Sequence, residues 1–193
     1  MKSILYLLAV VVFLGGCSYK NESINLSSYN AEYTGEISKE KKSVFIESVK
    51  DVRADKRTIG YILKDGVKTI NLFSTEDFSK NYKDGLSSAL RMAGFKAGTD
   101  ANADLVMSIS IKNIELIHND KSFDKNLKGE IELEVIIKKG NETITQNFKP
   151  SASKWIAPSY SSKDMEPFLN ELFSDSINDI VSRLTKHWFF KLT

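Results

Sequence analysis

Cysteine, histidine and proline are scarce in this chain of 193 residues, which contains one, two and three of them. The single cysteine, Cys17, cannot form a disulfide within the chain. His118 and His187 lie far apart without a neighbouring cysteine, so neither has the spacing of zinc ligands. We expect His118 in a polar loop and His187 on the surface of the last helix. Nucleotide-binding and serine-hydrolase motifs are also missing, and we expect neither a metal site nor a catalytic site.

An excess of charge of either sign is missing too. The chain has 27 basic and 25 acidic residues and a net charge of +2, so it has no general attraction to nucleic acid. Hydrophobic residues make up 41% of the chain, which is typical of a folded domain. Glu47, Asp51 and Asp55 could form an acidic pair for general acid–base catalysis, but no second group converges on them in the sequence. A structural role is favoured for them, and we expect that the protein is not an enzyme.

The longest apolar run, residues 4–14, is too short to cross a membrane but fits the hydrophobic region of a signal peptide. It follows Lys2 and ends in the order Leu-Gly-Gly-Cys over residues 14–17, which resembles the lipobox of bacterial lipoproteins. The resemblance implies cleavage before Cys17, a diacylglyceryl group on its sulfur and an acyl chain such as palmitate on its nitrogen. The alternative is a free thiol at the end of an uncleaved anchor.

The lipobox also leads to an expected location. Several acyl chains on one residue hold a protein at a membrane far more firmly than the marginal binding of one chain. Residue 18 is Ser and not Asp, which by analogy with the lipoprotein sorting rule favours the outer membrane over the inner one. We expect a domain that faces the periplasm, with the inner membrane and the cell surface as alternatives. We expect no cofactor besides the acyl chains, and an envelope protein as the partner.

Residues 18–42 are rich in Ser, Asn, Glu and Lys and show little apolar periodicity. This composition predicts a flexible tether that reaches about 25–30 Å and lifts the folded domain clear of the lipid headgroups. The predicted organisation is a signal peptide over residues 1–16, the lipidated cysteine and tether over 17–42, and one domain over 43–193. Alternatively, part of the tether adds an edge strand to the domain.

Hydrophobic periodicity predicts an α+β domain with two layers, in which two helices pack on one face of a mainly antiparallel sheet. The expected order is strands, helix, three strands, helix. Asp65-Gly66 indicates a hairpin turn, and a change of phase near Lys112–Asn113 indicates a β-bulge. The predicted elements are a strand near 44–52, a hairpin over 58–74, a helix over 74–94, strands over 103–117, 127–138 and 142–151, and a last helix that starts at Ser161.

A charged stretch follows the first predicted strand. Asp51 and Arg53 lie on the same face of an extended segment, and the Arg53 guanidinium can bind a carboxylate or carbonyl groups in a bidentate manner. Gly60 is suited to a positive φ. Two interpretations are open: Arg53 fastens the loop internally, or the loop, with Asp55, is exposed for recognition of a partner.

The same stretch resembles a known family. Asp51-x-Arg53, Asp55 and Ile59-Gly60 match the D-x-R-x-D-x-x-x-I-G stretch of the YajG family of bacterial lipoproteins. The predicted helix that ends in Ala-Gly-Phe at 93–95 and the Ala-Asp-Leu at 103–105 also match. The resemblance implies a membrane-anchored, periplasm-facing domain and brings no established catalytic residues. The longer tether and the aromatic C-terminal tail depart from the family's pattern.

Two groups of aromatic residues have alternative interpretations. Trp188, Phe189 and Phe190 follow one another near the C-terminus, and Trp155 lies in a short segment between predicted elements. Each group either covers the core or forms an exposed patch for a partner or the membrane interface. The leading functional hypothesis is a non-catalytic binding or scaffolding module of the cell envelope. The alternative is a lipid- or glycan-handling accessory of an envelope transport system, similar to LptE-like or transport-auxiliary lipoproteins.

Overall fold

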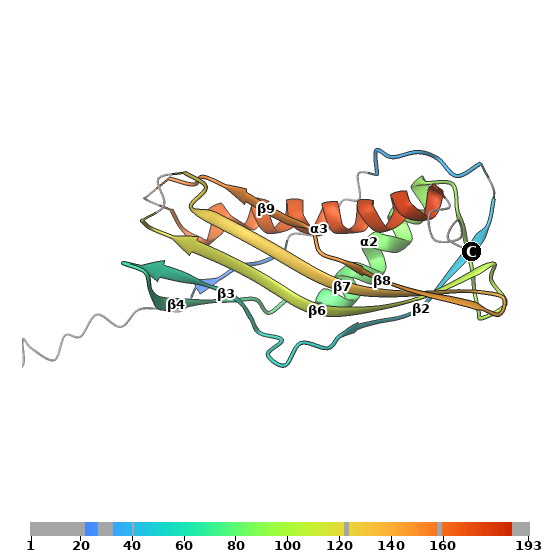
Figure 1. Ribbon diagram of the computed structural model, residues 1–193, viewed down its shortest axis with the longest axis horizontal. Coiled ribbons are helices and arrows are strands. Elements are labelled where there is room, and N and C mark those ends of the chain that lie inside the picture. The colour runs from blue at the N-terminus through green and yellow to red at the C-terminus, as the bar shows by residue number, and fades with distance from the viewer. Residues whose placement is uncertain (1–21, 27–32, 40, 122–123, 158–159, 187–193) are drawn as a thin grey trace, which may run out of the picture.

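A computed structural model describes residues 22–26, 33–39, 41–121, 124–157 and 160–186. Within them, one sheet of nine strands carries two helices on one face (Figure 1). This confirms the predicted α+β class. The elements are β1 (Glu22–Ser23), β2 (Ser43–Asp51), β3 (Thr58–Lys64), β4 (Val67–Phe73), α2 (Phe78–Met92), β5 (Lys96–Ala97), β6 (Leu105–Asn119), β7 (Leu127–Lys139), β8 (Glu142–Phe148), β9 (Ser151–Lys154) and α3 (Ser162–Thr185).

The sheet is built around the long antiparallel pair β6 and β7. On the side of β6 that faces away from β7, β2 pairs with the first half of β6 and β3 pairs with its last residues, both in parallel. On the side of β7 that faces away from β6, β9 pairs with the first residues of β7 and β8 pairs with its second half, both antiparallel. β4, β1 and β5 extend the sheet beyond β3 and β2. The sheet is therefore mixed, because β2 and β3 run in the same direction past β6.

Turn chemistry places the hairpin and the first helix. Asp65 and Gly66 both have positive φ, 53° and 79°, which confirms the predicted two-residue turn between β3 and β4. The α2 helix begins one turn later than the sequence predicts, since Asp77 and not Ser74 is the N-cap and accepts a hydrogen bond from the Lys80 N–H. Gly94, at φ 86°, follows its C-terminal end.

The predicted β-bulge is present in β6. The register against β7 shifts between Ile111 and Asn113, so the buried side chains on both sides of the shift face the same layer. In β7, buried and half-exposed residues alternate, as expected for a strand with one wet face. At the start of α3, Ser161 and Asp164 form the predicted capping box.

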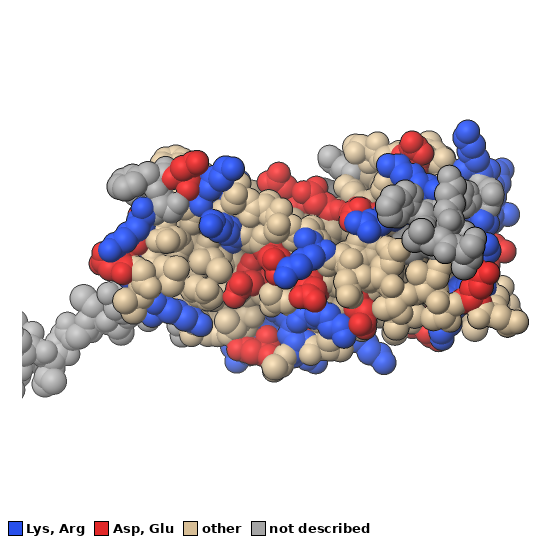
Figure 2. All heavy atoms as spheres, in the orientation of Figure 1, with Lys and Arg blue, Asp and Glu red and all other residues tan. Residues whose placement is uncertain are grey.

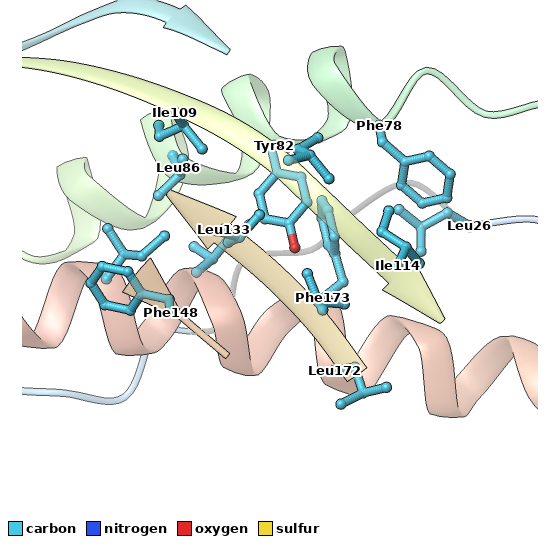
Figure 3. Close-up of a cluster of buried hydrophobic side chains, with 14 of the residues drawn as sticks. Leu26, Phe78, Tyr82, Leu86, Ile109, Ile114, Leu133, Phe148, Leu172 and Phe173 are labelled. Atoms are coloured by element: carbon cyan, nitrogen blue, oxygen red, sulfur yellow. The ribbon is translucent and has the colours of Figure 1, made fainter. Parts of the chain in front are cut away.

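The core lies between the sheet and the two helices. Tyr82 from α2 and Phe173 from α3 meet with their ring centroids 4.2 Å apart, and Figure 3 shows them among strand side chains such as Leu133. The Tyr82 hydroxyl lies 2.8 Å from the Ser176 Oγ, so its polar tip is satisfied inside the core. These contacts fix α2 and α3 against each other as well as against the sheet.

The described residues 22–26 and 33–39, which precede Ser43, are part of this domain. β1 pairs in parallel with β4, and Ile24, Leu26 and Tyr33 are buried in the core. The backbone N–H of Asn25 also donates to Glu166 of α3. The edge-strand alternative therefore describes residues 22–26 better than a tether that runs to residue 42. The sequence hides this because Ile24 and Leu26 are isolated apolar residues in a polar segment, and burial depends on the distant partners β4 and α3.

Candidate functional site

Arg53 is at the centre of the loop that the sequence singles out. Its Nε and Nη2 donate to the two carboxylate oxygens of Asp51 at 3.0 and 2.7 Å, with side chains only 4% and 10% exposed. Nη2 and Nη1 also donate to the carbonyl oxygens of Lys56 and Thr58. The guanidinium carbon lies 5.1 Å from the centroid of the Phe78 ring on α2. These donors are used inside the loop, and this geometry fits the structural interpretation of Arg53.

The loop has a clear architectural task. It leaves the edge of β6 after β2 and returns to the same edge as β3, so its path decides whether the two strands lie in line. Asp55 accepts hydrogen bonds from the backbone N–H groups of Arg57 and Thr58. A hydrogen bond from the Thr58 side chain and those two backbone bonds lower the pKa of the exposed Asp55 carboxyl.

Gly60 permits β3 to approach β6. Its φ is 155°, a positive value as the sequence suggests, and a Cβ at this position would overlap the backbone carbonyl of Leu116. Only glycine leaves room for this pairing. The acidic residues of the same region do not converge. Glu47 accepts a hydrogen bond from Ser108 Oγ, whereas Asp51 faces Arg53.

A groove between α2 and the first half of β2 is a second candidate site, with a cavity volume of about 240 Å³. Its apolar surface includes Val44, Ile46, Leu90 and Phe95, all of them buried. Three exposed basic residues line it: Lys83, Arg91 and Lys96. Among the described residues, no ion pair is found for any of the three.

The sequence contains a signal for this groove in the polar residues of α2, which the hydrophobic pattern of the helix does not show. Lys83, Ser87 and Arg91 are four residues apart, so they form one row along α2 beside its buried face. Elsewhere the charges are mixed. Figure 2 shows acidic and basic side chains interspersed over the face that it presents, in keeping with the net charge of +2. The cations of the groove are notable because none of the three forms an ion pair with a described residue.

His118 is buried in β6, only 1% exposed, and not in a loop as the sequence suggested. It extends the inward-facing row of β6 by one more residue, and its ring packs on Tyr160 with the centroids 4.1 Å apart. Neither ring nitrogen has a hydrogen-bond partner among the described residues. Burial lowers the pKa of His118, against the opposing charge of Asp120. Burial also raises the pKa of Tyr160 to about 12, with smaller contributions from the charges of Glu22 and Asp120.

The buried imidazole predicts a pH dependence of stability. His118 stays neutral in the fold below the pH of about 6.5 at which it gains a proton in the unfolded chain. The unfolded state then binds more protons, so the free energy of unfolding should fall as the pH drops below about 6.5, by at most about 1.4 kcal/mol for each pH unit.

Urea denaturation of the wild type and of His118→Phe at several pH values between 7.5 and 5 measures the difference. The variant should lose this part of the slope, whereas Tyr160→Phe, which keeps the stacked ring, should retain it. Equal slopes for the wild type and His118→Phe would contradict the assignment.

The other residues singled out from the sequence have different outcomes. Trp155 follows β9 and is 53% exposed, so it does not cover the core. Cys17, His187, Trp188, Phe189 and Phe190 lie outside the described residues. Among the residues that the structure does describe, no three His, Cys, Asp or Glu side chains are grouped so as to hold a metal ion. No helix in the same ranges is long and apolar enough to cross a membrane.

A solved structure of similar architecture supports the fold. Protein XCC0632 from Xanthomonas campestris, of the family DUF330, is similar over 88% of this chain and 94% of its own, with a TM-score of 0.50 and 12% identity. Lipoprotein GNA1162 from Neisseria meningitidis is more distant, with a TM-score of 0.33 and 10% identity over 72% of this chain and 97% of its own. No curated protein sequence matches. The model of a family described as uncharacterized lipoprotein, Lipoprotein_16, matches residues 34–183, and the chain therefore belongs to this lipoprotein family.

Proposed function

We propose that this protein is a membrane-anchored bacterial lipoprotein whose domain is a non-catalytic binding or scaffolding module of the cell envelope. Membership of the lipoprotein family and the lipobox-like sequence at residues 14–17 support the anchor. We further propose acylation of Cys17, a place in the outer membrane with the domain facing the periplasm, and kinship with the YajG lipoproteins through the Asp51-x-Arg53 stretch.

The groove beside α2 is the single observation that carries the binding role. Its floor is apolar, while Lys83, Arg91 and Lys96 line it without an ion pair among the described residues. This combination suits an extended protein segment that presents both apolar side chains and carboxylates, because apolar contact supplies affinity and charge supplies orientation. Its volume of about 240 Å³ lies below the roughly 300–1,000 Å³ of typical small-molecule pockets, so a peptide segment fits the groove better than an enclosed lipid.

Photo-crosslinking in intact cells tests the binding role. A benzophenone amino acid in place of Ser87, which lines the groove, should give an adduct of discrete mass on a denaturing gel. Lys83→Glu with Arg91→Glu should reduce the adduct at least fivefold, because like charges then face the carboxylates of the partner.

Ser88 provides the matched control position. It lies on the same helix and is half-buried like Ser87, but it does not line the groove. Crosslinking from position 88 should be much weaker and should not respond to the charge reversal. Equal adducts from both positions, or an adduct from position 87 that survives the charge reversal, would remove the groove as the binding site.

A further inference from the structure

Few residues separate the proposed anchor from the folded domain. β1 begins at Glu22, and Cys17 precedes it by five residues. A chain of five residues spans at most about 18 Å, whatever its conformation. If the acyl chains on Cys17 insert in a bilayer, as the proposed function holds, Glu22 therefore lies within about 18 Å of the lipid surface. The domain is not lifted clear of the headgroups.

The direction of β1 shows which end of the domain is nearest. β1 runs parallel to β4, with Glu22 opposite Leu72, so its entry side points toward the start of β4 at Val67. From Leu72 back to Val67 is also five residues, or about 17 Å of strand. A fully extended chain from Glu22 back to Cys17 would thus place Cys17 at about the level of the turn between β3 and β4. The acyl chains can enter the bilayer on this side only when the turn is close to the headgroups.

Several elements end near this turn. β6 ends at Asn119, which pairs with Leu63 just before the turn. β7 starts opposite His118, and the last residue of β9, Lys154, pairs with the first residue of β7. Figure 1 shows these strand ends together at one end of the long sheet, on the left of the view. The exposed residues Val67 and Trp155 lie there.

The chemistry of this end fits a membrane interface. Trp155 is 53% exposed, and tryptophan is enriched where an apolar ring and a polar N–H meet lipid and water. The Lys121 side chain forms an ion pair with the turn, with its Nζ 3.3 Å from Oδ1 of Asp65. Long lysine side chains can place their ammonium groups at lipid phosphates while their stems stay on apolar surface.

We propose that this end of the domain, formed by the β3–β4 turn and Trp155, rests on the phospholipid headgroups of the leaflet that holds the Cys17 acyl chains. Trp155 then inserts at the interface and, with the anchor, gives the domain a second point of contact. The groove lies at the other end of β6, where Val44 pairs with Leu105. The thirteen residue-to-residue steps from Leu105 to His118 correspond to about 43 Å of strand. The anchored domain thus presents its groove roughly 40 Å away from the membrane.

Fluorescence quenching by brominated lipids tests the orientation. The processed protein is purified from membranes, its intact mass is measured, and it is reconstituted in vesicles of phosphatidylethanolamine and phosphatidylglycerol with or without bromine on the acyl chains. In a Trp188→Phe variant, Trp155 is the only tryptophan. In brominated vesicles, the emission of Trp155 should be at least twofold lower than in unbrominated vesicles. In unbrominated vesicles, its emission spectrum should be blue-shifted.

A matched control places the only tryptophan at the opposite end. Met92, 46% exposed at the end of α2, is replaced by Trp in a chain that also carries Trp155→Phe and Trp188→Phe. Its emission should be the same in both kinds of vesicle.

Three results would overturn the inference. A mass without acyl chains on Cys17 would remove the proposed anchor and the orientation with it. Acylated protein in which Trp155 is no more quenched than the tryptophan at position 92 would remove the orientation alone and leave the lipoprotein function standing. A Trp155 spectrum that is blue-shifted in native membranes, but neither blue-shifted nor quenched in lipid vesicles, would assign this end to a protein partner.

Discussion

Replacement of Arg53 by methionine should lower the free energy of unfolding by about 3–5 kcal/mol. Methionine keeps an apolar stem near the Phe78 ring but leaves the Asp51 carboxylate, only 10% exposed, without its cation. The carbonyl groups of Lys56 and Thr58 lose their donor as well. Breaking one side of a buried pair is costly because the remaining charge stays desolvated. Urea denaturation followed by circular dichroism measures the change.

Two further variants separate this effect from a general loss of charge. Lys80→Ala removes an ion pair with Asp84 whose side chains are 70% and 63% exposed, and it should leave the free energy of unfolding nearly unchanged. Adding Asp51→Asn to Arg53→Met should recover part of the loss, because no buried charge is then left uncompensated. If Arg53→Met were as stable as Lys80→Ala, Arg53 would not fasten the loop, and the interpretation of the loop as exposed for a partner would be favoured.

The features that the sequence predicts correctly are those with local causes. The turn at Asp65-Gly66 follows from the ease with which these residues adopt positive φ, and the bulge in β6 follows from a change in alternation within one strand. Arg53 and Asp51 are two residues apart, so their contact is also visible locally. These signals place most helices and strands and the central residues of the loop.

The features that were missed depend on distant partners. Ile24 and Leu26 are buried only because β4 and α3 meet beside them, and His118 is buried because the inward-facing row of β6 continues into a segment of polar composition. The groove requires α2, β2 and β5 together, although the row of Lys83 and Arg91 was visible on the helix. The mixed sheet depends on the in-line placement of β2 and β3 along one edge of β6, for which a single strand pattern has no signal.

That placement leads to the second large effect. Replacement of Gly60 by alanine should lower the free energy of unfolding by roughly 3–5 kcal/mol, as the sum of overpacking and backbone strain. The added Cβ would overlap the backbone carbonyl of Leu116 in β6, and φ is 155° at this position. A flexible side chain could move aside, but a carbonyl inside a sheet cannot shift without disturbing its pairing. Urea denaturation measures the loss, and hydrogen exchange should show reduced protection in β3 and in the end of β6.

Gly66→Ala is the matched control in the turn that follows. Gly66 also has a positive φ, 79°, but a Cβ there would meet no atom within 4 Å. Its replacement should therefore cost only the conformational penalty, about 1 kcal/mol, and leave protection of β6 unchanged. The difference between the two variants isolates the contact of β3 with β6, which the loop around Arg53 serves to align. Equal losses in the two variants would mean that β3 can move away from β6 without a penalty, and the in-line arrangement of β2 and β3 would then lose its structural support.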